Sequence, residues 1–142
     1  MKRALIDVNV VLDVLLNRQP HVTASSTVWA AIENRSAEGM LAAHAVTTIH
    51  YLIAKEHGAA KARRTMNSIL RVFRVAMVNE EVIQQALRLS SPDCEDSVTA
   101  SAALLAGCDV IVTRDPKGFR GSPVRALTPE AAAPILAISS AG

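Results

Sequence analysis

Three aspartates occur at points of the sequence where a hydrolytic metal site could form. Asp7 directly follows an apolar run at residues 3–6, and Asp115 lies two residues past a second apolar run at residues 109–113. Asp96 falls in the first turn of a segment with helical period. In an open parallel sheet, functional groups gather outside the carboxyl ends of the strands. If the two runs are neighbouring strands, we expect the three carboxylates to converge.

A cluster of three ionised carboxylates requires a compensating charge. At about 5 Å and an effective dielectric near 20, each pair repels by about 3 kcal/mol. A hard cation such as Mg²⁺ or Mn²⁺ compensates best, because it prefers carboxylate and water oxygens. Such a cation polarises a phosphoryl oxygen and supplies a hydroxide-like nucleophile, which is the chemistry of phosphodiester hydrolysis. The spacing alone leaves one alternative open, since an Asp after a strand is often a cap or turn residue.

The elements that would position these aspartates follow the pattern of βα units around a parallel sheet, which predicts an α/β fold. The strands are expected at residues 3–6, 40–43, 73–78, 109–113 and 124–127, with Glu38-Gly39 as the turn into the second. The helices are expected at residues 8–16, 22–34, 46–57, 59–71, 80–90 and 94–106. A last helix opens at Thr128-Pro129-Glu130. Before residues 94–106, Ser91 is expected as the cap and Pro92 at the first helical position.

Length and composition indicate one domain. A chain of 142 residues, half of them apolar, can bury one core but is too short for two, so we expect a single domain at residues 1–138 and a frayed tail at 139–142. The opening Met1-Lys2-Arg3 imitates a signal peptide, but Asp7 interrupts the apolar run and no small-residue cleavage site follows. No apolar stretch approaches the roughly 18 residues of a membrane span. A soluble cytoplasmic protein is expected.

Cysteine and histidine give no metal-site pattern. Cys94 and Cys108 show no zinc-site spacing and are expected as free thiols. The histidines are scattered and are expected at the surface or partly packed; they are His21, His44, His50 and His57.

Positive charge is concentrated in one segment, although the net charge is only +2. Residues 55–74 contain six basic residues against Glu56 alone, a local charge of +5; the basic residues are Lys55, Lys61, Arg63, Arg64, Arg71 and Arg74. Such a segment could face phosphates. The alternative is a solvated helix face.

Three segments in order resemble the PIN-domain family over nearly the whole chain. Residues 5–12 resemble the PIN-domain start, in which a strand ends in Asp and a small residue, Asn and apolar positions follow. Residues 93–103 resemble the acidic helix start of the family. Residues 108–115, followed by Phe119 and residues 127–130, resemble its C-terminal signature.

The resemblance implies a fold, an activity and partners. The implied fold is a three-layer αβα sandwich around a five-stranded parallel sheet of order 3-2-1-4-5, often found as a homodimer. Many bacterial members are VapC-like toxins, Mg²⁺-dependent endoribonucleases that a cognate antitoxin neutralises. Carried over to this chain, the resemblance implies Asp7 and Asp96 as principal metal ligands and Asp115 as the residue completing the site. Asp93 would assist through water.

The sequence departs from the PIN-domain pattern at two positions. Thr48 stands where many members carry a Glu, so Asp93 or Glu95 would replace that acid, or the enzyme would work with one ion. Val8 stands where a Thr or Ser hydroxyl often orients the first Asp.

In the light of this resemblance, we expect supporting roles for residues around the acidic cluster. Asn9 and Thr113 are expected to hydrogen-bond the cluster, with Thr48 beside them; ordinary turn capping is the alternative for Asn9 and Thr113. RNA phosphates or a partner would be bound by the basic residues Arg63, Arg64, Arg114, Lys117 and Arg120, which could equally be solvent-exposed charges.

Two other classes of function compete with a nuclease. A haloacid-dehalogenase-like phosphatase would use Asp7 as nucleophile, but its general acid two residues later is here Asn9. A receiver domain needs a phosphoacceptor after the third strand, where Val78-Asn79 offers none. The remaining rival is an inactive PIN fold that binds RNA or a partner, which Thr48 favours and the retained aspartates oppose.

Overall fold

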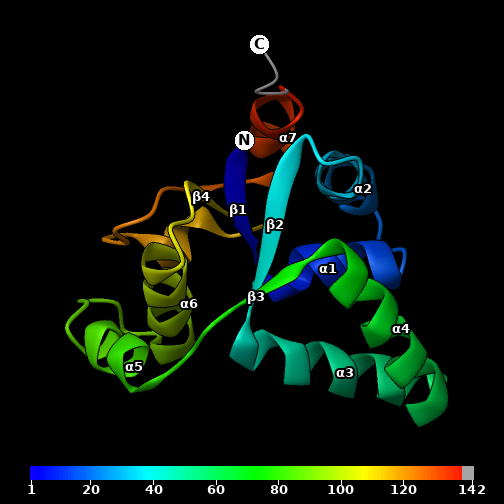
Figure 1. Cartoon of the computed structure of the whole chain (residues 1–142), viewed down its shortest axis with the longest axis horizontal. Helices are drawn as coiled ribbons and strands as arrows, with labels where there is room; N and C mark the ends of the chain where they lie inside the picture. The colour runs from blue at the N-terminus through cyan, green and yellow to red at the C-terminus, as the bar shows by residue number, and fades with distance from the viewer. Residues whose placement is uncertain (139–142) are drawn as a thin grey trace.

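The protein consists of one parallel sheet and eight helical segments within residues 1–138, the part of the chain that the computed structural model describes (Figure 1). The strands are β1 (Lys2–Ile6), β2 (Ala37–Ala42), β3 (Arg74–Ala76), β4 (Val110–Val112) and β5 (Ala126–Leu127). The helices are α1 (Val8–Leu15), α2 (Val22–Glu33), α3 (Ala43–His57), α4 (Ala59–Val72), α5 (Glu80–Leu87), α6 (Cys94–Leu105), the 3₁₀ helix η1 (Pro116–Phe119) and α7 (Pro129–Leu136).

The strand order is β3-β2-β1-β4-β5, with every pair parallel, which confirms the predicted order and the three-layer fold. The chain builds outward from β1 to β3, then returns to pair β4 with the free side of β1. The order therefore reverses between β1 and β4, the position where open α/β sheets form their crevices. Asp7 and Asp115 follow those two strands.

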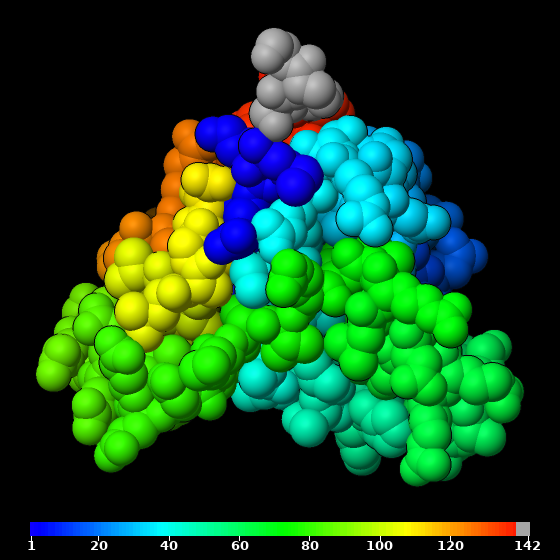
Figure 2. Space-filling view, in the orientation of Figure 1, coloured from blue at the N-terminus to red at the C-terminus, as the bar shows by residue number. Residues whose placement is uncertain are grey.

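Side chains alternate along the strands and fill two cores, one on each face of the sheet. On β1, Ala4 and Ile6 join a core formed mainly with α1, α2, α3, α4 and α7. Leu5 points the other way, into a core formed mainly with α5 and α6. Figures 1 and 2 show α5 and α6 on one side of the molecule and the α3–α4 hairpin on the other, spreading apart at the end away from α7.

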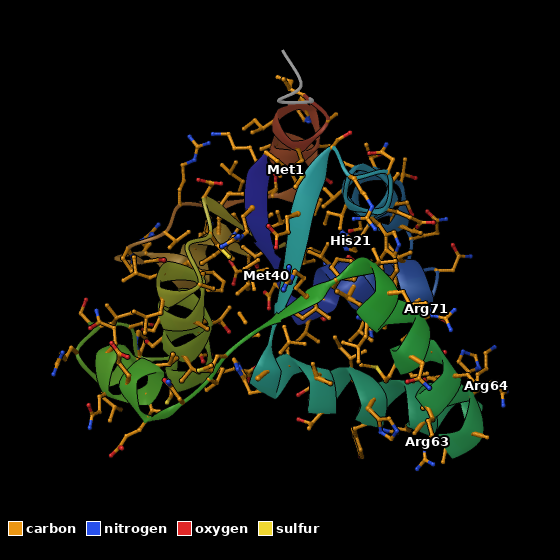
Figure 3. All side chains as sticks on the ribbon, viewed as in Figure 1. Met1, His21, Met40, Arg63, Arg64 and Arg71 are labelled. Atoms are coloured by element: carbon orange, nitrogen blue, oxygen red, sulfur yellow. The ribbon has the colours of Figure 1, made fainter. Side chains whose placement is uncertain are left out.

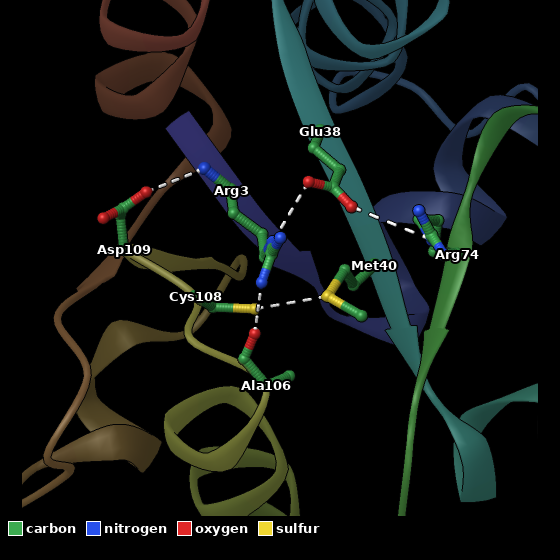
Figure 4. A network of polar contacts seen from close by, with 7 residues as sticks. All are labelled: Arg3, Glu38, Met40, Arg74, Ala106, Cys108 and Asp109. Carbon is green, nitrogen blue, oxygen red and sulfur yellow. Dashed lines mark hydrogen bonds and ion pairs between the residues drawn. The ribbon is translucent and has the colours of Figure 1, made fainter. Parts of the chain in front are cut away.

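A polar network ties together the ends of the strands remote from Asp7 (Figure 4). The Arg3 side chain donates to Glu38 Oε2 at 3.0 Å and to the carbonyl of Ala106 at 2.6 Å, so it joins β1 to β2 and to the end of α6. The backbone N–H of Arg3 donates to Asp109 Oδ2 at 2.8 Å. Beside it, burial raises the pKa of the Cys108 thiol to about 11, which keeps that thiol protonated.

The expected turn at Glu38-Gly39 is wrong, because both residues lie inside β2. The chain turns earlier, at Arg35, whose φ is 67°. Gly39 lies in the strand because two side chains pack directly on it, Ile32 of α2 and Phe73, which follows α4: a Cβ there would lie 2.7 Å from Ile32 Cδ1 and 2.8 Å from Phe73 Cδ1. The glycine therefore marks a close packing contact, and the sequence pattern alone could not distinguish this from a turn.

The other differences concern where elements begin and end. Asp93 caps α6, and its Oδ1 accepts the N–H of Asp96 at 3.1 Å, so the predicted cap at Ser91 is wrong. Ser91 instead accepts the N–H of Asp93 at 3.2 Å in the preceding turn. Helix α3 begins three residues earlier than expected, α5 ends at Leu87, and η1 was not predicted.

Two sequence expectations are not settled by these boundaries. The predicted frayed tail at 139–142 lies outside the described residues, and the single domain at 1–138 stays a prediction. Among the helices of residues 1–138, none has the length and apolar character that crossing a membrane requires.

Candidate functional site

Asp7 stands at the junction of β1 and α1 and is held there by both neighbouring elements. Its backbone N–H donates to the carbonyl of Val112 at the end of β4, at 2.9 Å. Its Oδ1 accepts the N–H of Val8 at 2.9 Å, and its Oδ2 accepts the hydroxyl of Thr113 at 2.8 Å. Burial raises the pKa of Asp7, against the opposing effect of these two hydrogen bonds.

The Thr113 hydroxyl connects two of the three aspartates. It donates to Asp7 Oδ2 and accepts the backbone N–H of Asp115 at 3.1 Å. The Thr113 residue is 1% exposed, so water does not compete for these bonds. One buried hydroxyl thus sets the position of Asp7 relative to the backbone that carries Asp115.

Asp96 and Asp115 approach each other across Gly118 in η1. A Cβ at Gly118 would lie 2.7 Å from Asp96 Oδ2 and 3.7 Å from Asp115 Oδ2. Both oxygens therefore face the same small volume beside the glycine backbone. Only glycine leaves that volume open, and sequence reasoning gave Gly118 no role.

The acidic groups act on one another electrostatically. Burial first, and then the negative charges of four neighbours, raise the pKa of Asp96 from 3.8 to about 6; the neighbours are Asp93, Asp7, Glu95 and Asp115. The part of this shift that comes from the neighbouring charges is the repulsion that the sequence predicted for clustered carboxylates. The protein without a cation holds Asp96 in a site that disfavours its charged form.

A crevice of about 510 Å³ opens beside these groups. Its walls include the acidic Asp93, Asp96 and Asp115 and the basic Lys117 and Arg120. Asp115, Lys117 and Arg120 are exposed, so a solute can reach them. Carboxylates and cationic side chains therefore line one opening at the carboxyl end of the sheet.

The donor set suits a hydrated hard cation. Within residues 1–138, no three carboxylate, imidazole or thiolate groups stand close enough together to enclose an ion as they are placed. Mg²⁺ does not need such a cage, because it keeps several waters and binds through one or two carboxylates. Oxygen donors on Asp7, Asp96 and Asp115 fit that requirement, and a cation would relieve the repulsion at Asp96.

Arg114 precedes Asp115 in the chain but is not among the residues that line the crevice, and its partner is an aspartate that sequence reasoning did not assign. Arg114 Nε is 3.1 Å from Oδ2 of Asp13, a fully buried residue of α1. Ser25 of α2 donates to the same oxygen at 3.2 Å. The positive charge of Arg114 lowers the pKa of Asp7, so the guanidinium lies near both carboxylates. The missed signal was an Asp directly after the apolar residues 10–12 of a helix.

His44, expected at the surface or partly packed, is also a neighbour of the site. It is the second residue of α3, and its Nε2 lies 3.3 Å from Thr99 Oγ1 on α6, one turn after Asp96. Its Nδ1 is buried without a hydrogen-bond partner among residues 1–138, and electrostatic interaction with His44 lowers the pKa of Asp7. No spacing pattern in the sequence distinguishes His44 from the other three histidines.

The remaining predicted residues lie apart from the acidic groups or make other contacts. Asn9 is exposed and accepts a hydrogen bond from Arg18 at 3.3 Å, where a bond to the acidic cluster was expected. Thr48 is exposed and makes no side-chain hydrogen bond within the described part of the chain. Arg63 and Arg64 are exposed on α4, on the side of the view in Figure 3 opposite α6.

A comparison of the sequence with protein-family models identifies the family of this chain. The model of the PIN domain matches residues 3–117, which is most of the chain. The chain belongs to the PIN domain family. Nucleases of this family generally use divalent metal ions. No curated protein sequence matches the chain.

Solved structures share this PIN fold at low sequence identity. FitAcB from Neisseria gonorrhoeae is 21% identical with a TM-score of 0.71, covering 89% of this chain and 97% of that one. A chain of a toxin-antitoxin complex from Klebsiella pneumoniae is 19% identical with a TM-score of 0.67, and the match covers 89% of this chain and 97% of that one. VapC20 from Mycobacterium tuberculosis is 15% identical with a TM-score of 0.60, and the match covers 76% of this chain and 86% of that one.

The raised pKa of Asp96 predicts a pH-dependent effect of Asp96→Asn on the protein in EDTA. The folded pKa of about 6 exceeds 3.8, so the contribution of Asp96 to the stability of the wild type falls as pH rises from about 4 to about 6. Asn is neutral at both ends of that range. In thermal melts, Asp96→Asn should therefore raise the Tm relative to wild type at pH 7.5 and change it little at pH 4.

A matched control is Glu56→Gln, which removes one exposed negative charge on α3. Its Tm difference from wild type should be similar at the two pH values. A lower Tm for Asp96→Asn than for wild type at pH 7.5 would contradict the repulsion between the carboxylates.

Proposed function

We propose that the protein is a metal-dependent endoribonuclease that hydrolyses RNA phosphodiester bonds, acting in the cytoplasm as the toxin of a toxin-antitoxin pair. The observation that supports this most directly is the approach of Asp96 Oδ2 and Asp115 Oδ2 across Gly118, with Asp7 tied to Asp115 through Thr113. These carboxylates come from three elements far apart in the sequence. Membership of the PIN domain family agrees with this chemistry.

The proposed cofactor is Mg²⁺, or Mn²⁺ in its place, held by Asp7, Asp96 and Asp115 with Asp93 assisting through water. A bound divalent cation supplies Lewis acidity to the scissile phosphate and to the attacking water. Thr113 fixes the orientation of Asp7, and the cap made by Asp93 fixes the first turn of α6 that carries Asp96. Lys117 and Arg120 border the same crevice and would contact phosphates of the bound RNA.

The partners proposed for the protein come from its structural relatives. The VapC20 structure is described as a toxin that cleaves the sarcin-ricin loop, and the Klebsiella pneumoniae structure as a toxin-antitoxin complex. By analogy, we assign this protein an RNA substrate, a cognate antitoxin and a homodimeric state. The exposed Arg63 and Arg64 supply a basic surface for docking RNA.

The second proposal is a PIN fold that binds RNA or a partner without cutting. Thr48 favours it, because an exposed threonine occupies the position where many PIN domains carry an acid. The raised pKa of Asp96 opposes it, because a site without a metal has no physical reason to keep carboxylates that repel one another. The catalytic proposal therefore agrees better with the electrostatics of the site.

Incubation with structured RNA tests the proposed activity. Wild-type protein should cut the RNA in Mg²⁺ or Mn²⁺ and leave it intact in EDTA. Asp7→Ala and Asp96→Asn should lower the rate at least a hundredfold, because both remove a proposed metal ligand. RNA that stays intact with wild-type protein and either metal, while still being bound, would support the non-catalytic alternative.

Gly118→Ala tests whether the space beside η1 matters for metal binding. The backbone of Gly118 is not left-handed, so alanine is tolerated there, but its Cβ would displace the Asp96 carboxylate. We expect about tenfold weaker Mn²⁺ binding by calorimetry, the size typical of disturbed ligand positioning. The Tm in EDTA should change little. Unchanged Mn²⁺ affinity would show that Asp96 does not bind the cation from this position.

Arg63→Glu with Arg64→Glu tests the basic surface of α4. Loss of two phosphate contacts should weaken RNA binding and reduce the slope of log affinity against log salt by about 1.4. Mn²⁺ affinity should not change. The control is Lys2→Glu with Arg125→Glu, the same charge change at two exposed positions. An equal loss in both double variants would mean that α4 contributes only net charge.

A further inference from the structure

The Asp13 carboxylate is the most completely buried charged group outside the proposed metal ligands. Asp13 is 0% exposed and lies in α1, which packs against α2 and α3. Its Oδ2 contacts Arg114 and Ser25, and its Oδ1 has no hydrogen-bond partner within residues 1–138. Burying a carboxylate is unfavourable unless a counterion compensates it. Within the described residues, Arg114 is the only cationic side chain that contacts Asp13.

The contact with Asp13 occupies only one part of the Arg114 guanidinium. Nε lies 3.1 Å from Asp13 Oδ2 as an ion pair, although its N–H makes no hydrogen bond within residues 1–138, and the side chain as a whole is 29% exposed. Nη1 and Nη2 make no hydrogen bond to residues 1–138, and neither is among the buried unpartnered atoms, so both reach solvent. An arginine held at Nε can still offer a fork of N–H donors, the geometry that matches two oxygens of a phosphate.

Arg114 adjoins the acidic site in the chain. It lies between Thr113, whose hydroxyl holds Asp7, and Asp115, whose oxygen faces Gly118. Its charge acts on Asp7. RNA approaching clustered carboxylates is repelled, and a fixed cation beside them offsets that repulsion.

We infer that Asp13 is a positioning residue: it holds Arg114 so that the outer guanidinium nitrogens bind an RNA phosphate next to the proposed metal ligands. This inference rests on the proposed RNA substrate. It adds a phosphate subsite in which Asp13 of α1 sets the position of Arg114. Ser25 supports it by donating to the oxygen that faces Arg114. Removal of Asp13 would leave the arginine charged but free to move.

Asp13→Asn separates this role from a general charge effect, because the two predict opposite signs. Removing a negative charge near the site should strengthen RNA binding if only net charge matters. If Asp13 positions Arg114, the substitution should weaken binding about tenfold and reduce the salt slope by about 0.7, the loss of one phosphate contact to single-stranded RNA. Asn has nearly the shape of Asp and removes the buried charge, so we expect the variant to fold.

The measurement is fluorescence anisotropy with a labelled single-stranded RNA in EDTA, on wild type, Asp13→Asn, Arg114→Gln and the double variant. Gels confirm that the RNA stays intact, and melts confirm that each variant is folded. The two single variants should show similar losses, and the double variant should lose no more than either, because both act through one contact. Arg114→Gln leaves Asp13 buried and charged without a counterion, and this variant could fail to fold. In that case the RNA affinity of the double variant is compared with that of Asp13→Asn.

Asp109→Asn and Arg125→Gln are the matched controls, since both residues are exposed outside the crevice. Asp109→Asn should leave RNA binding unchanged or slightly tighter. Wild-type protein that binds and cuts RNA while Asp13→Asn binds equally well or better would overturn this inference and leave the proposed function standing. Wild-type protein that neither binds nor cuts RNA would overturn both.

Discussion

The acidic site depends on one hydrogen-bonded link between β1 and β4. The two strands pair in parallel, and the Thr113 hydroxyl then joins Asp7 to the backbone of Asp115. Everything else is placed relative to that link: Asp115 begins η1, and η1 brings Gly118 against Asp96. The strand order matters for the same reason, because only neighbouring strands can bring the two aspartates together.

The charges around this link are arranged in two tiers. The exposed tier, at the crevice, contains carboxylates whose negative charges, together with burial, raise the pKa of Asp96. The inner tier is the pair of Asp13 and Arg114, where one carboxylate is fully buried and its partner reaches the surface. The inner pair is nearly neutral as a unit, so it places a cation beside Asp7 without adding net charge to the site.

The sequence was sufficient for the fold and for the positions of the three aspartates along it, because both follow from local patterns. Apolar runs and helical period predicted the strands and helices, and the family resemblance implied the strand order. Contacts between distant segments were not predictable. Gly39 and Gly118 matter through what packs against them, Asp13 matters through Arg114 a hundred residues away, and His44 through Thr99 on another helix. None of these has a spacing signature, since each partner is chosen by the tertiary fold.

The pairing of β1 with β4 also determines when the acidic centre can exist. Asp7 is synthesised well before Val112 and Thr113, which hold it, and Thr113 follows it by 106 residues. Contacts of such long sequence separation form only after the intervening chain is available. A ribosome that has exposed β1, β2 and β3 therefore carries a nascent chain with no assembled centre. The topology therefore delays assembly of the acidic centre until β4 and Thr113 have been synthesised.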